Sequence, residues 1–82
     1  MTFGTAEKLC LIYTKEPTRR YVALDHDLTP SFTNDLDQAA LFATAHVKEW
    51  IAVLLCRDLI SNENQVQSVS LRDAMTIAFL VE

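Results

Sequence analysis

The sequence predicts an α+β fold, in which an antiparallel sheet of three to four strands carries one main helix packed on one face. Three observations support this fold class. Two short apolar runs flank a proline-containing turn near the N-terminus, and a later stretch repeats apolar residues every three or four positions. The 82 residues are 50% hydrophobic and 22% charged, a balance typical of a globular chain. We therefore expect residues 1–82 to form a single small domain.

The first two strands are predicted from residues 9–13 (LCLIY) and 20–24 (RYVAL). Both runs are short and rich in residues that favour strands. The segment between them, Lys15-Glu16-Pro17-Thr18, is typical of a turn, and proline suits a turn because it has no N–H to give to a strand ladder. Together they predict a β-hairpin. Residues 25–35 then form a polar loop, in which Phe32 either contacts the core or lies in a brief third strand.

A helical stripe begins at Leu36 and continues to Leu55. Asn34 or Asp35 is suited to cap its start. A single helix over residues 35–60 would be about 39 Å long, which is longer than a domain of this size is wide.

We therefore expect the helix to break near residues 42–44. Thr44 would cap a main helix from residue 45 to about residue 60, and the polar residues 61–65 would close it. Trp50 would pack this helix on the sheet, or alternatively serve as an exposed anchor at an interface.

The C-terminal stretch gives two alternatives. Residues 66–71 are predicted as a strand. Residues 70–81 fit a further strand, which their length and β-branched residues favour, or a helix capped by Ser70, with Asp73 completing a capping box.

The charge of the chain favours a protein partner over a nucleic acid. The chain has a formal net charge of -4, with residues 1–20 at +2 and residues 21–82 at -6. A nucleic-acid-binding protein normally presents a basic face, so we expect no direct DNA or RNA binding. An acidic body suits a host protein or complex with a basic surface. The alternative is that the negative charge only keeps a small protein soluble.

The acidic residues concentrate in one segment, because four aspartates fall within residues 25–37 with no lysine or arginine among them. Such a loop on a small scaffold can imitate the spacing of phosphates and engage a basic groove. Two alternatives are a divalent-cation site on oxygen ligands and a solvated loop whose aspartates cap turns and helices. The predicted partner-binding residues are Asp25, Asp27, Asp35, Asp37 and Glu49.

No residue pattern indicates catalysis. The serines lie in no nucleophile motif, and His26 and His46 have no serine or cysteine partner at an interpretable spacing. The aspartate spacing is not that of an EF-hand. We therefore expect no enzymatic activity, no cofactor and no metal site. Cys10 and Cys56 lie in apolar runs without a zinc-binding pattern, so each is predicted to be a buried, reduced residue, with a single disulfide as the alternative.

The N-terminus lacks the pattern of a signal peptide, and the sequence has no apolar run of about 20 residues. We therefore expect a cytoplasmic protein without a membrane span.

Residues 32–44 (FTNDLDQAALFAT) contain a pattern that is similar to one found in a known group of proteins. With Tyr21-Val22 before them and Glu49-Trp50-Ile51 after them, they resemble small proteins of phages and prophages. In these proteins a hairpin ending in Tyr-Val leads through a Thr-Asn-Asp-Leu-type turn to an Ala-x-x-Phe segment and a Ser/Thr-capped helix. The resemblance covers about residues 20–51, and the C-terminal segment departs from it by being longer and more apolar.

The resemblance implies origin on a mobile element, where many such proteins are small acidic α+β inhibitors of host defence machinery, anti-CRISPR proteins among them. No functional residue is carried over from it. The sequence therefore favours a non-catalytic inhibitor that binds a host nucleic-acid-handling defence complex in the host cytoplasm. The alternative is a structural or assembly module that forms a homodimer through the apolar residues 77–81.

Overall fold

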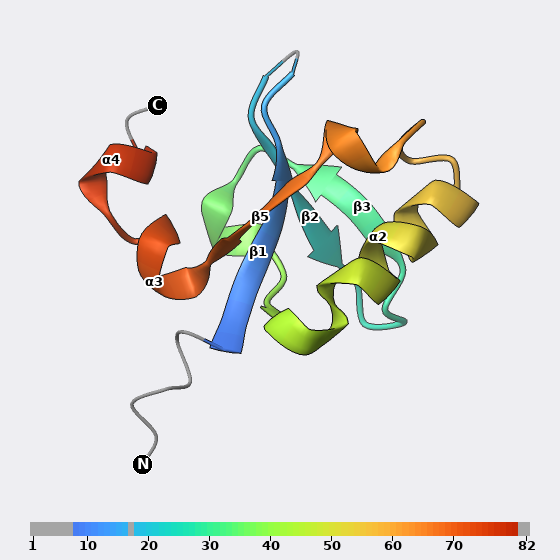
Figure 1. Cartoon of the computed structure of the whole chain (residues 1–82), viewed down its shortest axis with the longest axis horizontal. Coiled ribbons are helices and arrows are strands. Elements are labelled where there is room, and N and C mark those ends of the chain that lie inside the picture. The colour runs from blue at the N-terminus through green and yellow to red at the C-terminus, as the bar shows by residue number, and fades with distance from the viewer. Residues whose placement is uncertain (1–7, 17, 81–82) are drawn as a thin grey trace.

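A five-stranded antiparallel sheet lies at the centre of the structure, a computed structural model that describes residues 8–16 and 18–80 (Figure 1). The predicted α+β class with an antiparallel sheet is confirmed. The sheet has one strand more than the three to four predicted, because its shortest strand has only two residues and leaves no pattern in the sequence. The strands are β1 (Leu9–Thr14), β2 (Arg20–Leu24), β3 (Pro30–Thr33), β4 (Phe42–Ala43) and β5 (Gln67–Ser70).

Strand β1 is the central strand. Along one edge it pairs with β5, from Cys10 opposite Ser70 to Tyr13 opposite Gln67. Its other edge is shared, because β2 pairs with the C-terminal end of β1 at Tyr13, and β4 pairs with the N-terminal end at Cys10. The predicted hairpin and the brief third strand containing Phe32 are both confirmed. The predicted turn residue Pro17 lies outside the described residues.

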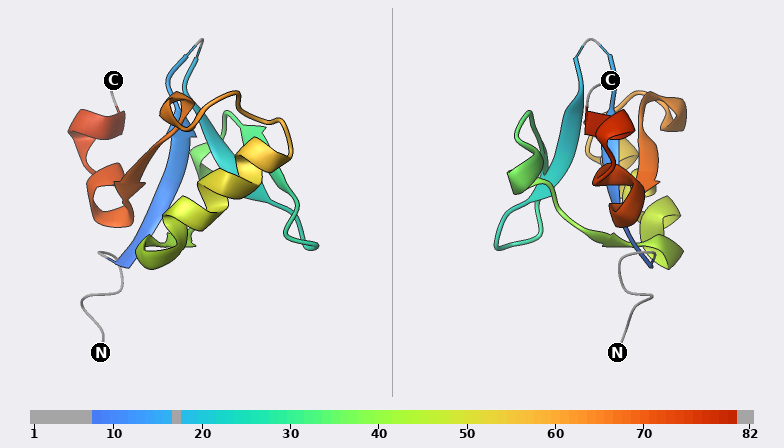
Figure 2. Two further views of the ribbon diagram at one scale, coloured as in Figure 1. Left: turned by 45° about the vertical axis from the view of Figure 1, so that its right-hand side comes forward. Right: turned by 90° about the vertical axis from the view of Figure 1, so that its left-hand side faces the viewer.

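Helices cover both sides of β1. Helix α2 (Val47–Cys56) lies on one side, and the short helices α3 (Leu71–Ala74) and α4 (Ile77–Leu80) lie on the other (Figure 2). Cys10 and Ile12 belong to the core cluster that α2 covers, whereas Leu11 and Tyr13 belong to the cluster on the side of α3 and α4. A strand that is buried on both faces has an unbroken apolar sequence. This is why the first predicted strand reads as a continuous run.

Helix α2 packs on the sheet through Leu54, which is 1% exposed and clusters with Val22 and Phe42. Trp50 is half-buried, with its ring centroid 5.2 Å from that of Phe42. The prediction that Trp50 packs the helix on the sheet is confirmed.

Helix α2 is shorter than the predicted span of 45 to about 60. It ends because Asp58 adopts a left-handed conformation with φ of 60°. The N–H of Leu59 then donates to the carbonyl of Leu54 at 3.0 Å, and the N–H of Asp58 donates to that of Leu55 at 3.1 Å. This pair of bonds is the Schellman arrangement that terminates helices.

The helical prediction is wrong for most of residues 35–43. The only helical element there is the 3₁₀ turn η1 (Leu36–Gln38). The chain then runs beside β2, where the N–H of Ala40 donates to the carbonyl of Val22 at 2.9 Å, and continues into β4. The apolar spacing wrongly predicts a helix because the apolar residues of this segment pack into two different core clusters. Leu36 and Ala39 pack on the side of α3 and α4, and Ala40 packs on the side of α2.

The predicted capping role of Thr44 is also wrong. Thr44 begins a second 3₁₀ turn, η2 (Thr44–His46), that leads into α2. The N-cap residue of α2 is His46, and its side chain makes no capping hydrogen bond. The predicted polar loop at residues 61–65 is confirmed and contains the 3₁₀ turn η3 (Glu63–Gln65).

The strand interpretation of the last segment is wrong, and the helical alternative is confirmed for α3 and α4. The hydroxyl of Ser70 accepts a hydrogen bond from the N–H of Asp73 at 3.1 Å, so Ser70 caps α3 as the alternative predicted. Phe79 in α4 is 7% exposed and meets Tyr13 edge-to-face at 5.2 Å. The aromatic side chain of α4 therefore turns inward onto the sheet. Residues 81–82 lie outside the described part.

The two cysteines differ in environment. Both thiols are free; Cys10 is buried as predicted, whereas Cys56 is exposed, so its predicted burial is wrong. Burial raises the pKa of the Cys10 thiol, and a hydrogen bond with the Thr44 side chain partly opposes that rise. A raised pKa keeps the thiol protonated at neutral pH, which makes Cys10 a packing residue.

Candidate functional site

The predicted acidic residues fall into separate places on the surface. Asp25 and Asp27 lie in the loop between β2 and β3, and Asp35 and Asp37 follow β3. Because β2 and β3 are antiparallel neighbours, these two pairs lie at opposite ends of β3. Glu49 lies in the first turn of α2. All five side chains are exposed, and the structure distributes them over three elements instead of one loop.

The loop after β2 is held together by Asp25. Its Oδ1 accepts hydrogen bonds from the N–H groups of Asp27 at 2.8 Å and Thr29 at 2.9 Å. Leu28, at the turn, has φ of 63° and is 59% exposed. A left-handed conformation costs a residue with a Cβ roughly 1–2 kcal/mol. The hydrogen bonds of Asp25 offset that cost and fix the loop in one shape.

Asp35 has a similar local role at the other end of β3. Its Oδ1 accepts a hydrogen bond from the N–H of Asp37 at 2.9 Å and caps η1. The alternative interpretation, that aspartates cap turns, is therefore confirmed for Asp25 and Asp35. Partner binding by the acidic set stays a prediction. The carboxylates of Asp27 and Asp37 have no such capping role among the described contacts.

Histidines accompany two of the acidic side chains. Glu49 Oε2 lies 3.0 Å from Nδ1 of His46, and Asp27 Oδ2 lies 3.5 Å from Nε2 of His26. Both pairs are solvent-exposed, so they contribute little to stability. Glu49 also suits the first turn of α2, where a negative charge is favourable.

Residues 8–16 and 18–80 contain no group of three or more His, Cys, Asp or Glu side chains that could hold a metal ion. In the segment that prompted the cation alternative, the two aspartate pairs lie at opposite ends of β3.

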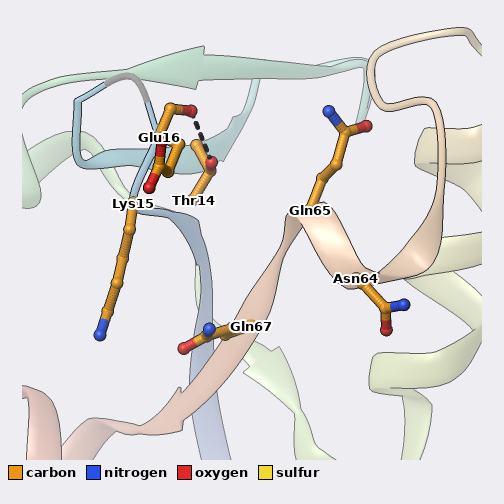
Figure 3. Close-up of a pocket in the computed structure, with 6 residues that line it drawn as sticks. All are labelled: Thr14, Lys15, Glu16, Asn64, Gln65 and Gln67. Carbon is orange, nitrogen blue, oxygen red and sulfur yellow. Dashed lines mark hydrogen bonds between the residues drawn. The ribbon is translucent and has the colours of Figure 1, made fainter.

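A cavity of about 310 Å³ lies where the end of β1 faces η3 and the start of β5 (Figure 3). Thr14 donates a hydrogen bond to the carbonyl of Glu16 at 3.1 Å, and Gln67 accepts one from the hydroxyl of Tyr13 at 3.0 Å. Oε1 of Gln65 accepts hydrogen bonds from the N–H groups of Ser61 and of Asn62, the N-cap residue of η3. These groups stabilise the fold. The sequence predicts a turn at residues 15–18, a polar loop at residues 61–65 and a strand at residues 66–71, and it indicates no functional role for them. The lining residues are Thr14, Lys15, Glu16, Asn64, Gln65 and Gln67.

Comparison with protein-family models, curated proteins and solved structures finds no match to this chain. No helix among the described residues is both long enough and apolar enough to cross a membrane.

Proposed function

We propose that the protein is a non-catalytic inhibitor from a phage or another mobile element. It binds a host nucleic-acid-handling defence complex, in the manner of anti-CRISPR proteins, and blocks it sterically or as a mimic of DNA. The observation that carries the proposal is the pair of acidic loops at the two ends of β3, which present Asp27 and Asp37 to solvent. The loop containing Asp27 is fixed by its own hydrogen bonds, which lowers the entropic cost of binding.

Electrostatics favours a basic protein surface as the partner. From Tyr21 to Val47 the sequence contains no lysine or arginine. This stretch includes both acidic loops, so their field is not neutralised by cations of the same segment. A negative surface of this kind raises the rate of association with a positively charged partner. It also repels nucleic acid, which fits a protein partner.

Charge reversal tests this proposal without disturbing the loops. Asp27→Lys, Asp37→Lys and Glu49→Lys should together abolish binding to the partner, because attraction becomes repulsion while Asp25 and Asp35 continue to hold their turns. The matched control is Glu16→Lys with Glu63→Lys and Asp73→Lys, which changes the net charge equally at other exposed positions. Binding is measured by capture from host lysate, identification of the captured complex and titration of that complex.

The proposal predicts a captured nucleic-acid-handling complex that binds the control variant as it binds the wild type. Equal binding of the charge-reversed variant, or capture of an unrelated class of protein, would overturn it. Circular dichroism of all three chains establishes that a loss of binding is not a loss of fold.

One observation favours the alternative of a homodimerisation module. Met75 is 60% exposed and Leu80 is 50% exposed, on the side of the molecule formed by α3 and α4. Phe79, by contrast, is buried against its own sheet and is not available to a second copy. A monomer in sedimentation at high concentration would exclude this alternative.

A further inference from the structure

The outer edge of β3 is open. Among the described residues β3 pairs with β2 alone, and it lies at the end of the strand order β3-β2-β1-β4. Edge strands present unpaired N–H and C=O groups that can pair with another chain. Edge strands of natural sheets commonly carry lysine, which prevents pairing with another chain. The four residues of β3 include no lysine, so only Pro30 and the short length of the strand limit such pairing.

The register shows which backbone groups face outward. The carbonyl of Val22 accepts a hydrogen bond from Ala40, so the peptide groups of Val22 point away from β3. Phe32 stands opposite Val22, and this pair is therefore a non-hydrogen-bonded pair of the antiparallel ladder. The N–H and C=O of Phe32 consequently point outward from the sheet. The carbonyl of Pro30, two residues earlier, points the same way.

The charges around this edge define what it can accept. Asp27 precedes β3 and Asp37 follows it, and four strand residues span about 13 Å. One cation lies beside the strand: the guanidinium of Arg20 is 4.7 Å from the centre of the Phe32 ring. A second copy of this chain would bring further acidic loops to the same edge, which like-charge repulsion disfavours.

We propose that β3 accepts an extended, basic segment of the partner protein as an added strand. The segment exchanges main-chain hydrogen bonds with Phe32, and lysine or arginine side chains near its two ends lie against Asp27 and Asp37. This inference rests on the proposed function, and it specifies that the partner binds through an extended basic segment that pairs with β3. Strand addition supplies affinity through the backbone, and the flanking charges supply specificity.

The test uses a synthetic eight-residue peptide of alternating lysine and valine as the probe, with the full chain as the receptor. The expected result is slower hydrogen exchange at the Phe32 amide on binding. Two control peptides should fail to produce it: one with glutamate in place of lysine, and one with N-methylated amides. Asp27→Lys with Asp37→Lys should weaken binding of the peptide by up to about thirtyfold, because two exposed ion pairs are lost and each contributes at most about 1 kcal/mol. Glu63→Lys with Asp73→Lys should leave the affinity unchanged.

Three results would overturn the inference. The hydrogen-exchange rate of the Phe32 amide could be unchanged by the peptide, or the N-methylated peptide could bind equally well. The third is slow exchange at the Phe32 amide in a dimer of the chain without peptide. If the full chain captures a defence complex but Phe32 stays unprotected in that complex, the edge proposal fails and the proposed function stands. If the peptide pairs with β3 but no defence complex is captured, the proposed function fails and the edge proposal stands.

Discussion

Replacing Phe79 with alanine is expected to lower the free energy of unfolding by about 3–5 kcal/mol, the usual cost of removing a buried aromatic side chain. Phe79 is 7% exposed and packs against Tyr13 and Tyr21. The guanidinium of Arg19 lies 4.1 Å from the centre of its ring and donates a hydrogen bond to its carbonyl. Phe79 therefore connects α4 to the hairpin, and its truncation removes part of the packing on this side of the sheet.

The free energy of unfolding of Phe79→Ala is measured by urea titration, with circular dichroism as the signal of unfolding. Met75→Ala is the matched control, because Met75 is 60% exposed in the same region and its truncation should change stability by no more than about 0.5 kcal/mol. A loss below about 1 kcal/mol for Phe79→Ala would contradict the packing of α4 on the sheet.

Leu54→Ala is expected to destabilise the other side of the sheet by about 2–5 kcal/mol. Leu54 is 1% exposed, and it fills the space between α2 and the cluster that contains Ile12 and Val22. Truncation leaves a cavity that the surrounding side chains fill only in part, and that cavity adds to the lost burial of the side chain.

The control for Leu54 is Leu41→Ala, since Leu41 is 47% exposed and the same chemical change should cost far less there. Thermal and urea unfolding of both variants give the comparison. Equal losses for the two leucines would mean that α2 does not bury Leu54 against the sheet.

Local signals made much of this fold predictable. The hairpin of β1 and β2 is marked by two short apolar runs around a turn, and α2 is marked by its stripe and by the change to polar residues after it. These features depend on neighbours in sequence, which periodicity records. The candidate site was predictable only as a group of aspartates close together in sequence; their separation by β3 into two places was not predictable.

The errors come from long-range packing. Residues 35–43 have helical spacing, yet Leu36 and Ala40 contact opposite sides of the sheet, which one helical stripe cannot represent. The C-terminal segment has the composition of a strand. It forms helices instead, and Phe79 is buried because its ring packs on Tyr13, a residue 66 positions away in sequence. The capping role of Asp25 depends on the turn that it closes, and only the backbone geometry shows it.

The most direct test of the proposed function is plaque formation by a targeted phage on CRISPR-immune host strains that express this chain. We expect the wild type to restore plaques on an immune strain. The control with Glu16, Glu63 and Asp73 changed to lysine should restore them equally, and the variant with Asp27, Asp37 and Glu49 changed to lysine should not. Full immunity in every strain expressing the folded wild-type chain would contradict the account, as would equal restoration by the charge-reversed variant.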